Sequence, residues 1–248
     1  MAALMLDWLR RDSAEPVLDL ANGPLPITIR RHARATRLTM RLAPDGSEIR
    51  ITLPRWGSTR DALAFARERT AWVEAQLARI PQALAITPGT HLPYRGTNLL
   101  IDWHAQRPRR VRLAGERLEL GGPHDSLSPR VQRWLEREAL MHLEADLAFY
   151  CARGGQPLPQ LRLSRAQRRW GSCTGERSTG RCIRINWRLI MAPDHVRRSV
   201  VAHEVAHLVH FDHSPAFYTL LGKLYEGDLA QADHWLKREG RRLYAAFG

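Results

Sequence analysis

The chain has 248 residues, which is enough for one large domain or two smaller ones. Hydrophobic residues make up 44% of it and charged residues 25%, and this balance excludes an intrinsically disordered chain. No apolar run approaches the roughly 20 residues that span a bilayer, and residues 1–11 lack the basic segment that opens a secretory signal. We therefore expect a folded protein that does not enter a membrane.

The charge is strongly positive, with 38 lysines and arginines against 25 aspartates and glutamates and a formal net charge of +13. Such a field attracts polyanions, so nucleic acid, nucleotides and acidic proteins are candidate partners. A solvated arginine-rich surface explains the same charge, so charge alone selects no function. The arginines form groups at Arg30, Arg31, Arg34, Arg37 and Arg41, at Arg107, Arg109 and Arg110, and at Arg165, Arg168 and Arg169.

The three cysteines are an odd number without paired spacing. This favours a reducing compartment over a disulfide framework, and we expect a cytoplasmic protein.

The chain opens with a segment, residues 1–26, that reads as a poorly structured lead-in ending in turn-forming residues. From residue 27 the pattern becomes strand-like. Apolar residues alternate in 38–42 and 49–53 on either side of Pro44-Asp45-Gly46, which predicts a hairpin.

The next elements complete an expected β-rich subdomain over residues 27–121. Ser58 is the expected N-cap of a helix that runs to residue 79. Residues 90–103 and 110–120 read as two or three further short strands.

The run from Gly121 to Pro129 is the best candidate for a linker, and residues 130–248 form the expected second domain. Its first helix covers about 130–153, followed by strands near residues 162 and 184. A helix is expected over about 193–211, and Ser214-Pro215 opens another, because serine suits the N-cap and proline the first helical position.

The strongest motif is His203-Glu204-Val205-Ala206-His207, the pattern HExxH. Residues four apart lie about one turn apart on one helix face, so both imidazoles can reach the same metal ion. Zinc suits neutral imidazole ligands. Glu204 lies beside the first histidine and can take a proton from water without being a ligand itself. The apolar flanks predict a buried helix, in which ionisable side chains need a partner.

Two histidines on a straight helix cannot enclose an ion, so a third ligand must come from elsewhere. His210 would lie along the same line as the first two histidines and is disfavoured. His213 follows the expected end of the helix, and its side chain can approach from a new direction. Glu226 and Asp228, further along the chain, are alternatives to His213. Water would take the fourth position.

These residues resemble the YgjP-type metallopeptidase domain, which is related to the SprT and Spartan proteases and to M48-type metallopeptidases. The resemblance covers roughly residues 27–240. The chain departs from the family's pattern in residues 174–184, a stretch that is longer and more basic than the family's usual turn. In that family the histidine of the His-Ser-Pro element is the third zinc ligand, which implies His213 here. The matching elements are His203-Glu204-x-x-His207, His213-Ser214-Pro215-x-Phe217, Arg169-Trp170-Gly171-Ser172-Cys173 and the stretch 186–193.

The resemblance places the Arg169-to-Cys173 stretch near the metal, and we expect Trp170, Gly171, Ser172 and Arg169 to contact substrate. An edge strand there could pair with an extended peptide, and Gly171 would permit close backbone approach. A structural turn with Trp170 in the core is the alternative.

The sequence thus predicts an α+β protein in which a β-rich N-terminal subdomain with one helix precedes a zincin-like catalytic domain. The expected function is a zinc-dependent metallopeptidase with Glu204 as general base and peptide or protein as substrate. The alternative is a nucleoside triphosphate pyrophosphatase or phosphoester hydrolase, with arginines binding phosphates at the same metal. A third hypothesis is a non-enzymatic zinc protein that binds nucleic acid, although a structural zinc site has no use for Glu204.

Overall fold

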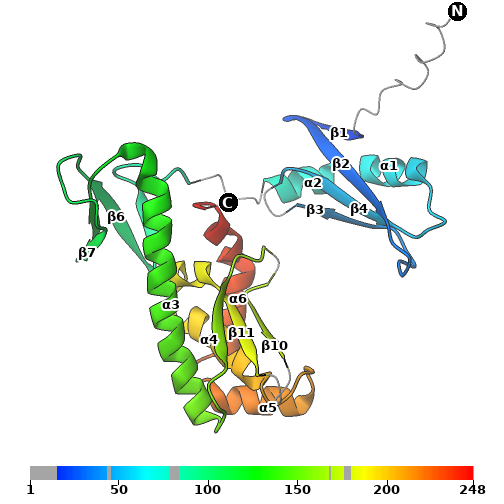
Figure 1. Cartoon of the computed structure of the whole chain (residues 1–248). Coiled ribbons are helices and arrows are strands. Elements are labelled where there is room, and N and C mark those ends of the chain that lie inside the picture. The colour runs from blue at the N-terminus through cyan, green and yellow to red at the C-terminus, as the bar shows by residue number, and fades with distance from the viewer. Residues whose placement is uncertain (1–15, 44–45, 79–83, 168, 176–179, 248) are drawn as a thin grey trace, which may run out of the picture. The chain divides into compact units, whose positions relative to one another are not determined.

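The protein is described by a computed structural model that covers residues 16–43, 46–78, 84–167, 169–175 and 180–247. It divides into two compact units, Met1–Pro81 and Gln82–Gly248. Both units combine sheets with helices, as the predicted α+β class requires (Figure 1). No helix within the described ranges has the length and apolarity needed to cross a membrane.

The first unit is a four-stranded sheet covered on one face by two helices. Its strand order is β1-β2-β4-β3, with β2 and β4 parallel. Alternate residues of β4, Ile49, Ile51 and Leu53, are buried and pack with Ala62, Ala66 and Val73 of the helices. The elements are β1 Val17–Leu20, β2 Gly23–Arg31, β3 Thr39–Leu42, β4 Ile49–Leu53, α1 Thr59–Glu68 and α2 Thr70–Leu77.

The expected hairpin is present as the antiparallel pair β3–β4, although residues 44–45 of its turn lie outside the described residues. Ser58 caps α1 by accepting a hydrogen bond from the backbone N–H of Arg60. The single helix expected over 58–79 is two helices, because the backbone at Arg69 leaves the helical region (φ −109°, ψ 19°).

The lead-in expected over residues 1–26 contributes a strand pair instead, while residues 1–15 lie outside the described ones. β1 pairs with the beginning of β2, and the apolar side chains of Leu18 and Leu25 are buried. Pro24 and Pro26 read as breakers in the sequence. They are tolerated because β2 pairs with β4 only from Ile27 onward, so these prolines face one neighbouring strand rather than two.

The second unit begins with a four-stranded sheet of order β5-β6-β8-β7, which packs on the first half of the long helix α3. Leu92, Ile101 and Leu118 of the strands share one core with Leu127 and Val131 of the helix. The elements are β5 His91–Tyr94, β6 Thr97–Trp103, β7 Arg112–Ala114, β8 Arg117–Leu120 and α3 Leu127–Arg153.

The boundary between the units therefore differs from the expected linker at 121–129. Because strands β5–β8 bury their apolar faces against α3, they belong to the second unit rather than to the first. Gly121, which reads as a linker residue, is closely packed, since a Cβ there would lie 2.0 Å from the carbonyl oxygen of Arg107.

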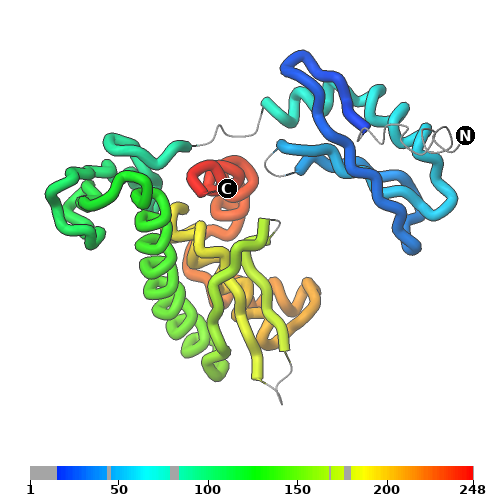
Figure 2. The backbone as a smooth tube through the Cα atoms, turned by 45° about the horizontal axis from the view of Figure 1, so that its top comes forward, coloured from blue at the N-terminus to red at the C-terminus, as the bar shows by residue number. Residues whose placement is uncertain are grey.

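The rest of the second unit places helix α4 between α3 and a three-stranded sheet of order β10-β11-β9. The three strands lie side by side in Figure 2, with β11 in the middle. Ser214 and Pro215 begin α5 as the N-cap and first helical residue, as predicted. The elements are β9 Gln160–Ser164, β10 Gly171–Thr174, β11 Cys182–Asn186, α4 Asp194–Ala206, α5 Pro215–Leu224 and α6 Leu229–Glu239, with short 3-10 helices η3 Trp187–Met191 and η4 Gly240–Tyr244.

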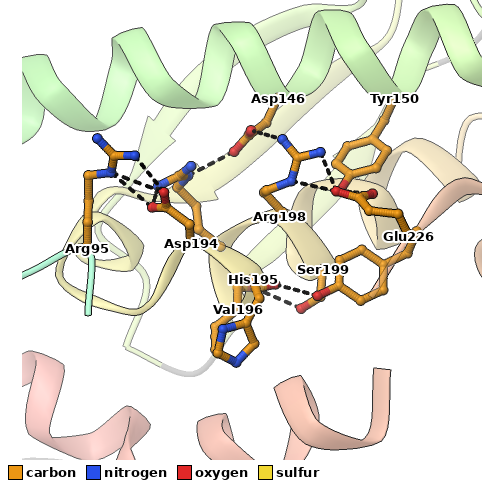
Figure 3. A network of polar contacts seen from close by, with 11 residues as sticks. Arg95, Asp146, Tyr150, Asp194, His195, Val196, Arg198, Ser199 and Glu226 are labelled. Carbon is orange, nitrogen blue, oxygen red and sulfur yellow. Dashed lines mark hydrogen bonds and ion pairs between the residues drawn. The ribbon is translucent and has the colours of Figure 1, made fainter. Parts of the chain in front are cut away.

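A chain of ion pairs fixes the beginning of α4 to its neighbours (Figure 3). Asp194 in the first turn of α4 pairs with Arg95 of the β5–β6 turn (2.6 Å) and with Arg197 (2.5 Å). Arg197 continues the chain to Asp146 of α3, with Nε 2.8 Å from Oδ2. Burial opposes ionisation of Asp194, but the two arginines outweigh it and lower the pKa of that carboxyl to about 2.

The same chain extends to the segment after α5. Arg198 donates to Asp146 Oδ1 at 3.1 Å and pairs with Glu226, which also accepts the hydroxyl hydrogen of Tyr150 (2.8 Å). Arg197 and Asp146 are only 3% and 4% exposed, so their pairing is shielded from water.

We expect Asp146→Ala to reduce the free energy of unfolding by on the order of 3 kcal/mol, because it leaves the buried guanidinium of Arg197 without its α3 partner. Urea unfolding followed by circular dichroism measures the loss. Glu119→Ala is the matched control, since it removes a carboxylate whose partner Arg112 is 73% exposed, and we expect it to cost less than about 1 kcal/mol. Equal losses in the two variants would contradict a structural role for the buried chain.

Candidate active site

Three histidines converge at the end of helix α4. His203 lies in the last turn of the helix, His207 directly follows it, and His213 lies just before α5. The Nε2 atom of His203 is 3.1 Å from that of His207 and 3.2 Å from that of His213. One ligand atom from each ring can be chosen so that all three lie within 4.8 Å of one another. The structure thus brings together the three histidines that the sequence predicts as metal ligands.

The bend after α4 orients these rings. The helix ends at Ala206, earlier than the expected residue 211, and the chain turns back toward α5. The carbonyl oxygen of His210 lies 2.9 Å from Nδ1 of His207, which leaves Nε2 of that ring facing the other imidazoles. Phe217 of α5 is fully buried beneath the cluster, with its ring centroid 4.6–4.9 Å from those of the three imidazoles.

The alternatives for the third position have other partners. His210 supports the site through its backbone rather than through its ring. Glu226 belongs to the ion-pair chain of Figure 3, bound to Arg198 and Tyr150. Asp228 caps α6 by accepting hydrogen bonds from the backbone N–H groups of residues 230 and 231.

The cluster has the properties of a metal site. Ligands about 2.0–2.1 Å from a tetrahedral zinc lie roughly 3.3 Å apart, close to the distances of 3.1 and 3.2 Å from Nε2 of His203 to Nε2 of His207 and of His213. Burial, aided by the neighbouring imidazoles, lowers the pKa of His203 to about 4, and burial also lowers the pKa of His207. These rings are therefore neutral at physiological pH and can present a nitrogen lone pair to a cation.

Glu204 is buried beside the histidines, with 5% of its surface exposed. Its Oε2 atom accepts no hydrogen bond from any described residue. Burial raises the pKa of Glu204 to about 7, although the positive charge of Arg169 acts in the opposite direction. An unpartnered carboxyl group of this kind, next to a metal site, is suited to accept and return a proton near neutral pH.

Gly171 provides the space that Glu204 occupies. A Cβ at residue 171 would lie 2.4 Å from Oε1 of Glu204, so only glycine lets strand β10 approach the carboxylate this closely. The sequence predicts that Gly171 admits a substrate backbone, and that stays a prediction; the group that lies against this glycine in the structure is the side chain of Glu204.

A cavity of about 680 Å³ opens beside His203 and Glu204. Of the residues expected to contact substrate, Trp170 and Gly171 line it. Ser172 lies further along β10, and Arg169 is exposed just before that strand. Trp170 also packs against Tyr244, with ring centroids 5.4 Å apart, so the core alternative holds for part of its ring.

Sequence reasoning missed the part of this cavity's lining that α5 and α6 supply. Tyr218 and Leu221 of α5 and Leu229 and Leu236 of α6 line it. Leu221 could be read as an amphipathic core position, and no local signal distinguishes such residues from core leucines. Tyr218 is 56% exposed, with its ring centroid 6.3 Å from that of His213.

A three-histidine cluster beside a buried glutamate is an arrangement that metal-dependent hydrolases use. The chain matches the family model described as YgjP-like, metallopeptidase domain, over residues 36–239, and it belongs to that family. The family implies a divalent metal, usually zinc, and a hydrolase. No curated protein and no solved structure matched the chain.

The raised pKa of Glu204 predicts a pH-dependent stability. A carboxyl group whose pKa is higher in the folded state stabilises that state below pH 4.5, and this contribution is lost as the pH rises through 7. In chelator-treated protein we therefore expect Glu204→Gln to be more stable than wild type at pH 8, by on the order of 3 kcal/mol. Urea unfolding at intervals between pH 5 and pH 8 should show the difference shrinking toward pH 5.

Glu144→Gln is the control, because Glu144 is exposed on α3. It should change the unfolding free energy little at any pH in this range. A difference between wild type and Glu204→Gln that stays constant from pH 5 to pH 8 would contradict a buried, unpaired carboxyl group.

Proposed function

We propose that the protein is a zinc-dependent metallopeptidase with Glu204 as its general base. The observation that carries this proposal is the placement of one buried, unpartnered carboxyl group beside three imidazole nitrogens, in the lining of a cavity. Membership of the YgjP-like metallopeptidase domain family supports the same conclusion.

His203, His207 and His213 would hold the metal. Three protein ligands with a remaining open position are typical of catalytic zinc, whereas structural zinc usually has four. When bound, zinc polarises a carbonyl group and lowers the pKa of water to about 7. His210 keeps the His207 ring oriented for this role, as outer-shell partners of metal ligands commonly do.

Glu204 would remove a proton from the attacking water and return it to the nitrogen of the departing amine. A pKa of about 7 allows both transfers near neutral pH, because the group exchanges a proton there at little free-energy cost. The burial that raises this pKa also keeps bulk water away from the carboxylate.

Strand β10 would align the peptide. It is an edge strand of its sheet in the described part of the chain, paired with β11 alone. An extended peptide can add to such an edge through backbone hydrogen bonds. Because Gly171 at the start of β10 contacts Glu204, a peptide on this edge would pass beside the base.

The cavity favours a peptide over a nucleotide. Its described lining contains one cationic side chain, Lys237, which pairs with Asp233 at 2.5 Å. A triphosphate needs several charge-assisted donors, whereas the leucines and the two aromatic rings of this lining suit apolar side chains. The pyrophosphatase alternative would depend on Arg169, which lies outside this lining but whose positive charge acts on Glu204.

We expect His213→Ala to lower zinc affinity more than the roughly 10- to 100-fold loss typical of an outer-shell change, because it removes a direct ligand. Zinc content after dialysis against a weak chelator, measured by atomic emission, gives the result. His210→Ala should retain zinc, since the interaction of residue 210 with His207 uses its carbonyl oxygen. Full zinc occupancy in His213→Ala would count against the three-histidine site.

We expect Glu204→Gln to bind zinc but to lose peptide hydrolysis by roughly 10²- to 10⁴-fold, the usual contribution of a general base. The assay compares a peptide library with the nucleoside triphosphates, using zinc-loaded wild type, Glu204→Gln and the exposed-site control Glu144→Gln. Pyrophosphate release that depends on Glu204, without peptide cleavage, would favour the alternative enzyme. Activities unaffected by Glu204→Gln would favour the non-enzymatic zinc protein.

A further inference from the structure

The topology of the first unit gathers basic residues at one edge of its sheet. β2 and β4 are parallel, so both end at this edge, and β3 begins there because it runs antiparallel to β4 (Figure 1). The segments 30–37 and 54–61 meet at this edge and contain one histidine and a single acidic residue, Asp61. We call their six arginines the basic edge: Arg30, Arg31, Arg34, Arg37, Arg55 and Arg60.

All six arginines are exposed. The ion pairs described within the first unit involve Arg50 and Arg69, and no arginine of the basic edge pairs with a described acidic side chain. Arg31 is held by neutral groups only, the carbonyl oxygen of Gly57 (3.4 Å) and the hydroxyl of Thr59 (3.0 Å). The positive charge of this edge is therefore not neutralised by the described residues around it.

Trp56 directly follows Arg55 of the basic edge. It is 81% exposed, the largest exposed fraction among the large hydrophobic side chains of the described residues. Two hydrogen bonds order its loop. The backbone N–H of Gly57 donates to the carbonyl oxygen of Pro54 (3.0 Å), and the guanidinium of Arg31 donates to the carbonyl oxygen of Gly57. The indole ring is thus presented to solvent on an ordered loop.

We propose that the basic edge binds single-stranded nucleic acid, with phosphates on the arginines and one base stacked on Trp56. Aromatic rings set among arginines are the combination that single-strand binding proteins use, and stacking requires an unpaired base. An anionic membrane is disfavoured, because residues 30–37 and 54–61 contain no large apolar side chain besides Trp56. The inference is independent of the proposed hydrolase activity.

Binding is measured by fluorescence anisotropy of a labelled 20-nucleotide oligo(dT), titrated with the full chain at several salt concentrations. We expect Trp56→Ala to bind about tenfold more weakly and Trp56→Phe to bind nearly as wild type, because phenylalanine keeps a stacking surface. The double variant Arg34→Ser/Arg55→Ser should reduce the slope of log affinity against log salt by about 1.4, the effect of two lost phosphate contacts.

The matched control is Arg133→Ser/Arg137→Ser, which removes two exposed arginines from α3 and gives the same net charge. It should bind as wild type, and Glu204→Gln should too, which separates this proposal from the hydrolase. The proposal is overturned if Trp56→Ala binds as tightly as wild type or if the α3 variant weakens binding equally. Binding to phosphatidylserine vesicles without binding to the oligonucleotide would also overturn it.

Discussion

The bend that follows helix α4 is the constraint on which the site depends. One face of a helix can present His203 and His207, but a straight helix cannot close around an ion. Ending the helix at Ala206 lets six residues return the chain, so that His213 approaches from the other side. Phe217 then packs under all three rings, so the start of α5 supports the geometry that the end of α4 begins.

Glu204 links this cluster to the sheet. Its carboxylate faces strand β10 at the position where Gly171 has no side chain, so the base and the edge strand are in direct contact. Any group that pairs with β10 near Gly171 passes close to the carboxylate. His203 and Glu204 are adjacent in sequence and therefore point in different directions from the helix. The side chain of His203 lies in the imidazole cluster, and that of Glu204 lies against strand β10.

The sequence predicted the local part of this arrangement well. The spacing of His203 and His207 and the Ser214-Pro215 start of α5 are encoded within a few residues, and the structure shows both elements where the pattern put them. The position of His213 after the helix already favoured it over Glu226, and the family resemblance strengthened that choice. No local pattern shows that Glu226 is bound elsewhere, because its partners Tyr150 and Arg198 are distant in sequence.

Other features depend on packing that local patterns do not report. Gly121 resembles a linker residue, yet it is packed against the backbone of residue 107, and the strands before it share a core with α3. Pro24 and Pro26 lie within strand β2 because this part of the strand pairs with β1 alone. The leucines of α5 and α6 that line the cavity follow ordinary helical spacing, so only the fold separates them from core positions.

The two ends of α4 are held by different means. The first turn is held by carboxylates and guanidinium groups, among them Asp194 and Arg197, while the last turn carries His203, which meets the imidazoles of His207 and His213. The groups that fix α4 in the fold are therefore separate from the groups that would hold a cation, so a substitution among the imidazoles leaves the anchor of the helix in place.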